Sequence, residues 1–110
     1  MTDVVIVVTT VADDEDAEEL ARLLVDERLA ACVNLHQPML SFYMWKGKVE
    51  RDTERQMVIK TTRERLPALQ ARLLQLHGYE LPEFLVLASE ASADYLGWVN
   101  EIVSPGRSQP

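Results

Sequence analysis

The spacing of apolar residues predicts a strand and then a helix at the start of the chain. Val4 to Thr10 is an apolar, β-branched run, typical of a strand buried on both faces at the centre of a sheet. The acidic segment that follows supplies helix N-cap candidates in Asp13 and Asp14. Apolar residues then recur at helical spacing and predict an amphipathic helix that ends at about Leu29; they are Ala17, Leu20, Ala21 and Leu24.

Extended structure is expected from Ala31 onward, in two arms joined by a turn at Lys46-Gly47. Glycine tolerates positive φ, so this pair suits the tight turn of a β-hairpin. The second arm is polar near the turn, with charges of both signs, and apolar from Met57 to Ile59. We therefore expect a solvated hairpin tip and a buried base.

A second helix is predicted by leucines at i, i+3, i+7 and i+10, which are Leu66, Leu69, Leu73 and Leu76. Pro67 fits only the first turn of this helix. In the stretch LHGYELPEF, His77 is expected in the last turn, and Gly78 is expected to end the helix in the left-handed conformation. Pro82 prevents the helix from resuming.

Two further elements and a tail complete the chain. A last buried strand is expected at Phe84 to Ala88 and a short helix at Asp94 to Val103, with Trp98 in the core. Residues from about 104 to 110 are expected to form a flexible tail. The order is βαββαβ followed by a helix, an α+β, ferredoxin-like sandwich in which two helices cover one face of a four-stranded antiparallel sheet. With 110 residues, the chain is interpreted as a single domain, residues 1–110.

The first arm of the hairpin, Cys32 to Trp45, is too long for a compact domain of this size. Without interruption it would span about 46 Å, whereas a domain of this length has a diameter of about 34 Å. Pro38 favours a bend, but Tyr43 and Trp45 lie beyond it among other apolar residues, and an isolated hairpin bearing them would be marginally stable. A neighbouring subunit can cover this surface, so Tyr43 and Trp45 are predicted interface residues of a cyclic oligomer.

The net charge of the chain limits which classes of partner are expected. The formal net charge is −7 and no Lys/Arg-rich block occurs, which argues against nucleic acid and against an anionic membrane surface as partners. The first residues lack the basic and long apolar segments of a signal peptide, and Cys32 is the sole cysteine. We therefore expect a cytoplasmic protein that interacts with cations, small ligands or other proteins.

Several residues carry candidate chemistry, each with a simpler structural explanation. Helix termination explains His77 but does not require Tyr79 and Glu80 beside it, so these two are the better functional candidates. Lys60 ends a strand before a helix N-terminus and could hold an anion, or extend its ammonium to solvent. Cys32 is a soft metal ligand in principle, with His36 on the same strand face, but no third ligand lies nearby in sequence.

Five separated motifs together resemble the CutA, or divalent-cation tolerance, family. These motifs are ERLAACVN, SFYMWKGKVE, VIKT, HGYELPE and YLGW, and the similarity runs from about Val4 to Val103. The resemblance implies a ferredoxin-like homotrimer similar in architecture to the PII signalling proteins. It also implies a role in bacterial tolerance to copper and other divalent metals.

The chain departs from the family pattern where metal binding is concerned. The family segment usually has proline where this chain has Gly78. Some relatives carry a cysteine in the first strand and a second histidine, and Thr9 and Leu76 occupy those places here. The resemblance therefore leaves His77 as the candidate metal ligand, and the thiol of Cys32 is a weaker candidate on its own chemistry. We expect no required cofactor, and weak binding of copper or another divalent cation.

Two classes of function remain to be compared. The first is a non-catalytic trimeric binding or regulatory protein, in which Lys60, His77, Tyr79 and Glu80 line a cleft between subunits. The second is an enzyme on the same fold, such as an acyl-phosphate hydrolase, which needs a glycine-rich anion loop with an arginine after the first strand. The acidic segment after Thr10 would repel phosphate, and the two histidines support no hydrolase constellation. The sequence favours the first class.

Overall fold

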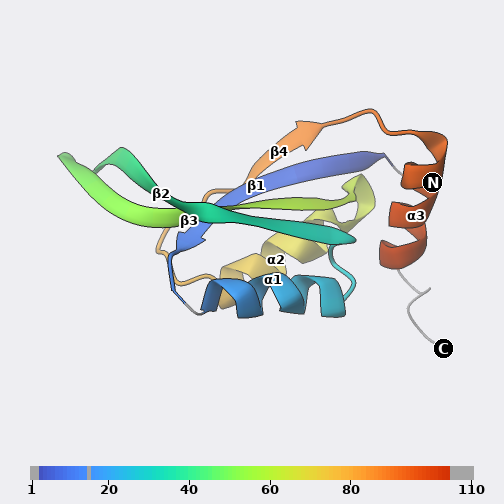
Figure 1. Ribbon diagram of the computed structural model, residues 1–110, viewed down its shortest axis with the longest axis horizontal. Helices are drawn as coiled ribbons and strands as arrows, with labels where there is room; N and C mark the ends of the chain where they lie inside the picture. The colour runs from blue at the N-terminus through green and yellow to red at the C-terminus, as the bar shows by residue number, and fades with distance from the viewer. Residues whose placement is uncertain (1–2, 15, 105–110) are drawn as a thin grey trace.

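A computed structural model describes residues 3–14 and 16–104 of the chain. The elements follow the predicted order: β1 (Val4–Ala12), α1 (Asp16–Asp26), β2 (Cys32–Trp45), β3 (Lys48–Thr62), the 3-10 turn η1 (Arg63–Arg65), α2 (Leu66–Leu76), β4 (Leu85–Ala88) and α3 (Ala93–Val103) (Figure 1). The predicted tail beyond Ser104 lies outside the described residues.

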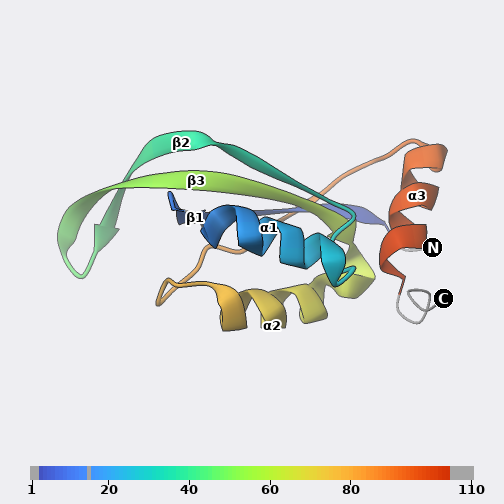
Figure 2. The same cartoon turned by 60° about the horizontal axis from the view of Figure 1, so that its bottom comes forward.

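The strands form one four-stranded antiparallel sheet in the order β2-β3-β1-β4, so the predicted ferredoxin-like arrangement is confirmed. Helices α1 and α2 lie side by side on one face of this sheet (Figure 2). Alternate residues of β1 and β3 point toward the helices and form the main core with leucines of α1 and α2; its fully buried members include Val7, Leu24, Met57, Ile59 and Leu69. β1 is one of the two inner strands, as predicted, but from Val5 onward its residues are alternately buried and half-buried, so it is not fully buried on both faces.

The hairpin of β2 and β3 extends beyond the region that the helices cover, and the long axis of the molecule is 46 Å (Figure 1). Its two-residue turn has positive φ at both Lys46 (51°) and Gly47 (80°), the geometry that matches the twist of a hairpin. The register shifts between Leu35 and Pro38: Leu35 pairs with Met57 and Pro38 with Arg55, so β2 carries one extra residue. This bulge lies at the bend that Pro38 predicted.

The bulge reverses which residues of β2 face the helices. Before it, Val33 and Leu35 pack against the main core. After it, Tyr43 and Trp45 lie on the opposite face, which α1 and α2 leave open, because side chains alternate and one residue has been inserted. The open face of the sheet thus continues along the inner side of the hairpin.

Helix α3 packs at the end of the sheet away from the hairpin (Figure 1). Val99 and Val103 form a second buried cluster there with Val4 and Ala31. Ser92 caps the helix by accepting a hydrogen bond from the Tyr95 N–H at 3.2 Å. Trp98, predicted to lie in the core, is 44% exposed and stacks at a tilt on Tyr95 instead.

Three other sequence predictions are corrected. Helix α1 ends at Asp26 rather than near Leu29, because Arg28 takes a positive φ of 59° and turns the chain toward β2. Gly78 is not left-handed: α2 ends at Leu76, and His77, which was expected in the last turn, is the C-cap residue and adopts an extended backbone. Strand β4 is formed, but all four of its residues are exposed rather than buried. The N-cap prediction is supported at Asp14, whose Oδ1 accepts a hydrogen bond from the Asp16 N–H at 3.0 Å.

Among the described residues, no helix is long and apolar enough to cross a membrane.

Candidate functional site

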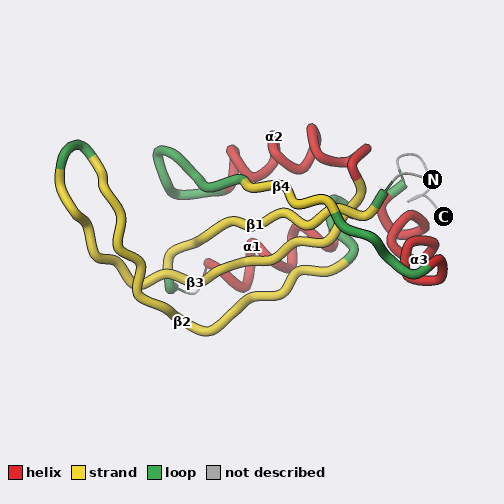
Figure 3. The backbone as a smooth tube through the Cα atoms, turned by 90° about the horizontal axis from the view of Figure 1, so that it is seen from above, coloured by secondary structure: helices red, strands yellow, loops and turns green. Residues whose placement is uncertain are grey.

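The main groove of the molecule lies between the hairpin and the loop that connects α2 to β4. Seen from above, the hairpin curves toward this loop (Figure 3). The inner face of the hairpin forms one wall, residues 78–85 form the other, and Thr10, Glu54 and Gln56 lie between them on the open face of the sheet. The groove has a volume of about 900 Å³. Three separate parts of the chain therefore converge on it.

His77 fixes the loop wall of the groove to the sheet. Its Nε2 lies 2.7 Å from the Thr10 carbonyl oxygen, and its Nδ1 accepts a hydrogen bond from the Tyr79 N–H at 3.1 Å. A backbone N–H can only donate, so the ring is the neutral tautomer in which Nε2 donates to Thr10. The imidazole also lies 4.7 Å from the ring of Tyr79, measured between centroids. His77 thus holds Tyr79 in place.

The floor of the groove carries a buried carboxylate. Glu54 is only 7% exposed, and within residues 3–14 and 16–104 no lysine or arginine forms an ion pair with it. Burial and, after it, a hydrogen bond to Glu54 raise the pKa of the Tyr79 hydroxyl well above its usual value. Burial and the charge of Glu54 likewise raise the pKa of the Glu83 carboxyl. The groove is therefore a region of negative potential.

The hairpin wall combines aromatic rings with further acidic groups. The Tyr43 hydroxyl donates a hydrogen bond to the Asp52 carboxylate, and this bond is the main cause that raises the pKa of Tyr43 to about 12. The Lys46 ammonium lies over the Trp45 ring, 5.7 Å from its centroid. Tyr43 and Trp45 both line the groove.

The structure brings together most of the residues that the sequence singled out. Tyr79 and Glu80 line the groove with Tyr43 and Trp45, and His77 adjoins it through Tyr79. Lys60 does not: it pairs with Ile6, four positions along β1 from Thr10, and lies outside the groove of the same chain.

The candidate metal ligands are separated. Cys32 is half-buried, carries a free thiol and pairs with Lys60, far along β3 from Glu54. His77 uses both ring nitrogens in hydrogen bonds to the backbone, so a metal ion would have to displace one of these bonds. In the described parts of the chain, no group of three His, Cys, Asp or Glu side chains is placed to hold a metal ion.

Sequence reasoning missed two acidic residues of the groove, Glu54 and Glu83. Glu54 falls in the polar half of the second hairpin arm, which was expected to be solvated. One feature of the sequence could have indicated it. Alternate residues of β3 share one face of the strand, so Glu54 lies on the same face as Gln56, Val58 and Lys60 and therefore toward the buried base of the hairpin. Glu83 belongs to the motif HGYELPE but lies beyond the residues that were chosen from it.

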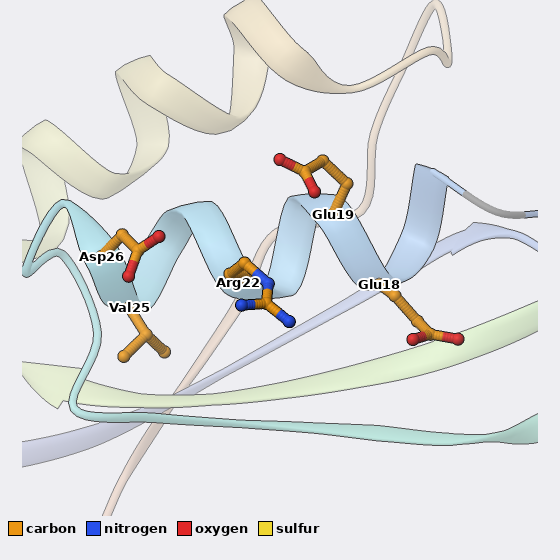
Figure 4. Close-up of a pocket in the computed structure, with 5 residues that line it drawn as sticks. All are labelled: Glu18, Glu19, Arg22, Val25 and Asp26. Carbon is orange, nitrogen blue, oxygen red and sulfur yellow. The ribbon is translucent and has the colours of Figure 1, made fainter.

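A second depression runs along α1, with a volume of about 510 Å³ (Figure 4). All five of its lining residues come from that one helix: Glu18, Glu19, Arg22, Val25 and Asp26. It has no opposite wall formed by another element, and its carboxylates lie beside Arg22. The hairpin groove, which has walls from three parts of the chain, is the better candidate site.

A sequence profile described as the CutA1 divalent ion tolerance protein matches residues 5–102. The chain belongs to the CutA family. The divalent-cation tolerance protein CutA of Pectobacterium atrosepticum is 44% identical over 99 residues, which cover 89% of this chain and 90% of the relative. A similar relative from Thermus thermophilus is 41% identical over 97 residues, 87% of this chain and 94% of the relative.

Solved CutA structures share the fold. The crystal structure of CutA from Xylella fastidiosa superposes with a TM-score of 0.88 at 39% sequence identity, and covers 94% of this chain and 100% of that one. The structure of the periplasmic divalent cation tolerance protein CutA from Archaeoglobus fulgidus gives a TM-score of 0.86 at 32% identity, with 92% and 99% covered. The family is named for metal tolerance, and these matches give no support to the alternative of an acyl-phosphate hydrolase.

Proposed function

We propose that this CutA protein is a trimeric, non-catalytic binding protein that acts in tolerance to divalent metals, with its ligand cleft at the junction between subunits. The observation that carries the proposal is the apolar surface of the hairpin and of β4, which one chain leaves uncovered. Met44 and Val49 on the outer side of the hairpin and Leu85 and Leu87 on β4 are all more than half exposed. A surface of this kind is typical of an interface between protein chains.

Strand β4 supports the same proposal. It pairs with β1 along one edge, and its other edge has no partner strand in the described residues. An exposed apolar edge strand favours pairing with another chain. In a cyclic oligomer, the hairpin of one subunit would cover β4 of the next and place both beside the groove. The PII-like trimer is the family architecture that this arrangement fits.

The two histidines give no support to an enzymatic role at the groove. A histidine acts as general base through an unprotonated ring nitrogen that can reach the substrate. Both ring nitrogens of His77 are held by backbone groups, and His36 lies on β2 outside the groove. The cleft residues Tyr79 and Glu80 would then recognise a ligand without transforming it, whereas Lys60 pairs with Ile6 and lies away from the groove.

Metal binding is proposed to be weak. An imidazole binds copper(II) more tightly than the other divalent ions of the first transition row. His77 is the candidate ligand, with Cys32 second. Occupancy of His77 requires loss of a backbone hydrogen bond, which lowers its affinity. A cytoplasmic location is part of the proposal, and a single cysteine with no disulfide partner is compatible with it.

Two measurements test the proposal. Light scattering coupled to size exclusion should give a mass near three chains at micromolar concentration, and Trp45→Asp should weaken assembly. Titration with copper(II) and zinc(II) should show weak binding that His77→Ala reduces. A stable folded monomer of the unmutated chain would contradict a cleft between subunits. Tight metal binding that persists in His77→Ala would show that His77 is not the metal ligand.

A further inference from the structure

The groove between the hairpin and the α2–β4 loop is lined by aromatic and acidic side chains together. Five aromatic rings line it, from Phe42, Tyr43, Trp45, Tyr79 and Phe84. Its charged residues are all acidic, namely Glu54, Glu80 and Glu83, and no lysine or arginine is among its lining residues. Aromatic faces and carboxylates share one electrostatic property, since both attract cations.

The buried position of Glu54 makes a cationic occupant favourable. A carboxylate removed from water loses hydration, and this loss is costly unless a positive charge or several hydrogen bonds replace it. The structure gives Glu54 a hydrogen-bonding interaction with Tyr79 but no ion pair in the described residues. Its charge also disfavours ionisation of Glu83 and Tyr79, and a cation in the groove would relieve both effects.

The groove fits an organic cation better than a bare metal ion. No three metal-ligating side chains converge in the described residues, and a volume of about 900 Å³ greatly exceeds that of one ion. The aromatic and apolar walls would exclude the hydration shell of a small metal ion but would pack against hydrocarbon.

We propose that the groove binds a small organic ammonium ion, held between the carboxylate of Glu54 and the aromatic rings of Tyr43 and Tyr79. This inference deepens the proposed function and rests on it, because it names the ligand class of the same cleft. The aromatic faces would surround the hydrocarbon that bears the charge, as in other aromatic sites for ammonium groups. Glu54 would supply the opposite charge, and Glu83 would add to it once ionised.

Isothermal titration calorimetry at constant ionic strength tests the assignment with three probes. Choline carries a quaternary ammonium, 1,4-diaminobutane carries primary ammoniums, and 3,3-dimethylbutan-1-ol is the uncharged isostere of choline. We expect saturable binding of at least one of the two cations and not of the alcohol. Choline alone would assign recognition to the rings, and the diamine alone would assign it to hydrogen bonds with carboxylates; both results support the proposal.

Variants locate the site. Glu54→Gln keeps the shape of the side chain and removes its charge, and should weaken binding of the cation by about tenfold or more. Glu101→Gln, an equal change of charge on an exposed residue of α3 outside the groove, should leave affinity unchanged. If circular dichroism shows that Glu54→Gln is unfolded, Glu83→Gln provides the same comparison. The proposal is overturned if neither cation binds, if the neutral alcohol binds equally, or if the groove variants bind as tightly as the unmutated chain.

Light scattering on the same samples separates this inference from the function on which it rests. A trimer that binds neither cation contradicts only the ligand class. A monomer that binds choline or the diamine with dependence on Glu54 supports the groove site and contradicts the trimer.

Discussion

Side chains alternate between two faces both in the sheet beneath α1 and α2 and in the hairpin that extends beyond it. Only the sheet beneath the helices is covered by its own chain. Leu24 and Met57 have no exposed surface under the helices, whereas Met44 on the outer side of the hairpin is 66% exposed. The sheet beneath the helices is a packed domain core, whereas the hairpin has an exposed apolar surface of the kind found at protein interfaces. Stability and assembly should therefore depend on different residues.

The largest expected effect is the loss of a core side chain. Leu24→Ala removes a fully buried side chain of the main core and should lower the free energy of unfolding by about 2–5 kcal/mol. Leu74→Ala on α2, where the side chain is 60% exposed, is the matched control and should change it by much less. Urea denaturation of both variants measures the difference. Equal losses would show that Leu74 is buried in the assembled protein.

Assembly should respond to the hairpin instead. Met44→Asp places a charge on its exposed outer surface, where a partner subunit would have to bury it, so the mass measured by light scattering should fall from near three chains toward one. Leu74→Asp, at a similarly exposed position on α2, should leave the mass unchanged. The comparison fails if Leu74→Asp dissociates the protein and Met44→Asp does not.

The acidic groove should make a smaller, pH-dependent contribution. The pKa of Glu83 is raised by burial and by Glu54, so the folded chain holds this proton more tightly than the unfolded chain does. The resulting stabilisation is complete below the unfolded pKa of about 4.3 and is lost as pH rises through the folded pKa. Glu83→Gln should therefore raise the Tm at pH 7 and leave it nearly unchanged at pH 4.

Thermal scans at the two pH values measure this effect, with Glu80→Gln on the exposed part of the same loop as the control. A gain in Tm of equal size at both pH values would show that the substitution acts through packing rather than through charge.

The smallest expected effect belongs to an ion pair on the helical side. Both carboxylate oxygens of Glu27 accept hydrogen bonds from Arg72 at 2.8 Å, and these bonds lower the pKa of Glu27. This contribution is present above the unfolded pKa of about 4.3 and is lost as pH falls through the folded pKa. Arg72→Met, which keeps the hydrocarbon stem, should lower the Tm slightly at pH 7 and leave it unchanged near pH 2.

Because the pair is exposed to solvent, salt should also reduce its contribution. A large loss of Tm in Arg72→Met that persists in acid would assign the role of Arg72 to packing.

The sequence predicted the elements well because local chemistry determines them. The β-branched run of β1, the leucine spacing of α2 and the Lys46-Gly47 turn each specify local conformation. Burial was predicted less well. Apolar residues in β4 and Trp98 in α3 indicated a core, but apolarity alone does not say whether the covering surface belongs to the same chain.

The candidate site was predicted only in part, since it depends on long-range register. The motif HGYELPE indicated Tyr79 and Glu80, whereas Tyr43 and Trp45 were predicted as interface residues and not as part of the cleft. That these two groups share one groove depends on the direction and extent of the hairpin's curvature, which Pro38 alone does not specify. Glu54 was missed because its strand is charged on average, although its own side chain is buried.

The bulge between Leu35 and Pro38 limits which insertions and deletions the hairpin can tolerate. Loss of a single codon there would leave the composition of the hairpin almost intact and both ends of β2 in place. It would nevertheless exchange the two surfaces of the hairpin, with Tyr43 and Trp45 moved to the outer side and Met44 moved into the groove. Insertions at the Lys46-Gly47 tip lengthen a loop, whereas a one-residue deletion at the bulge would alter assembly and ligand binding together.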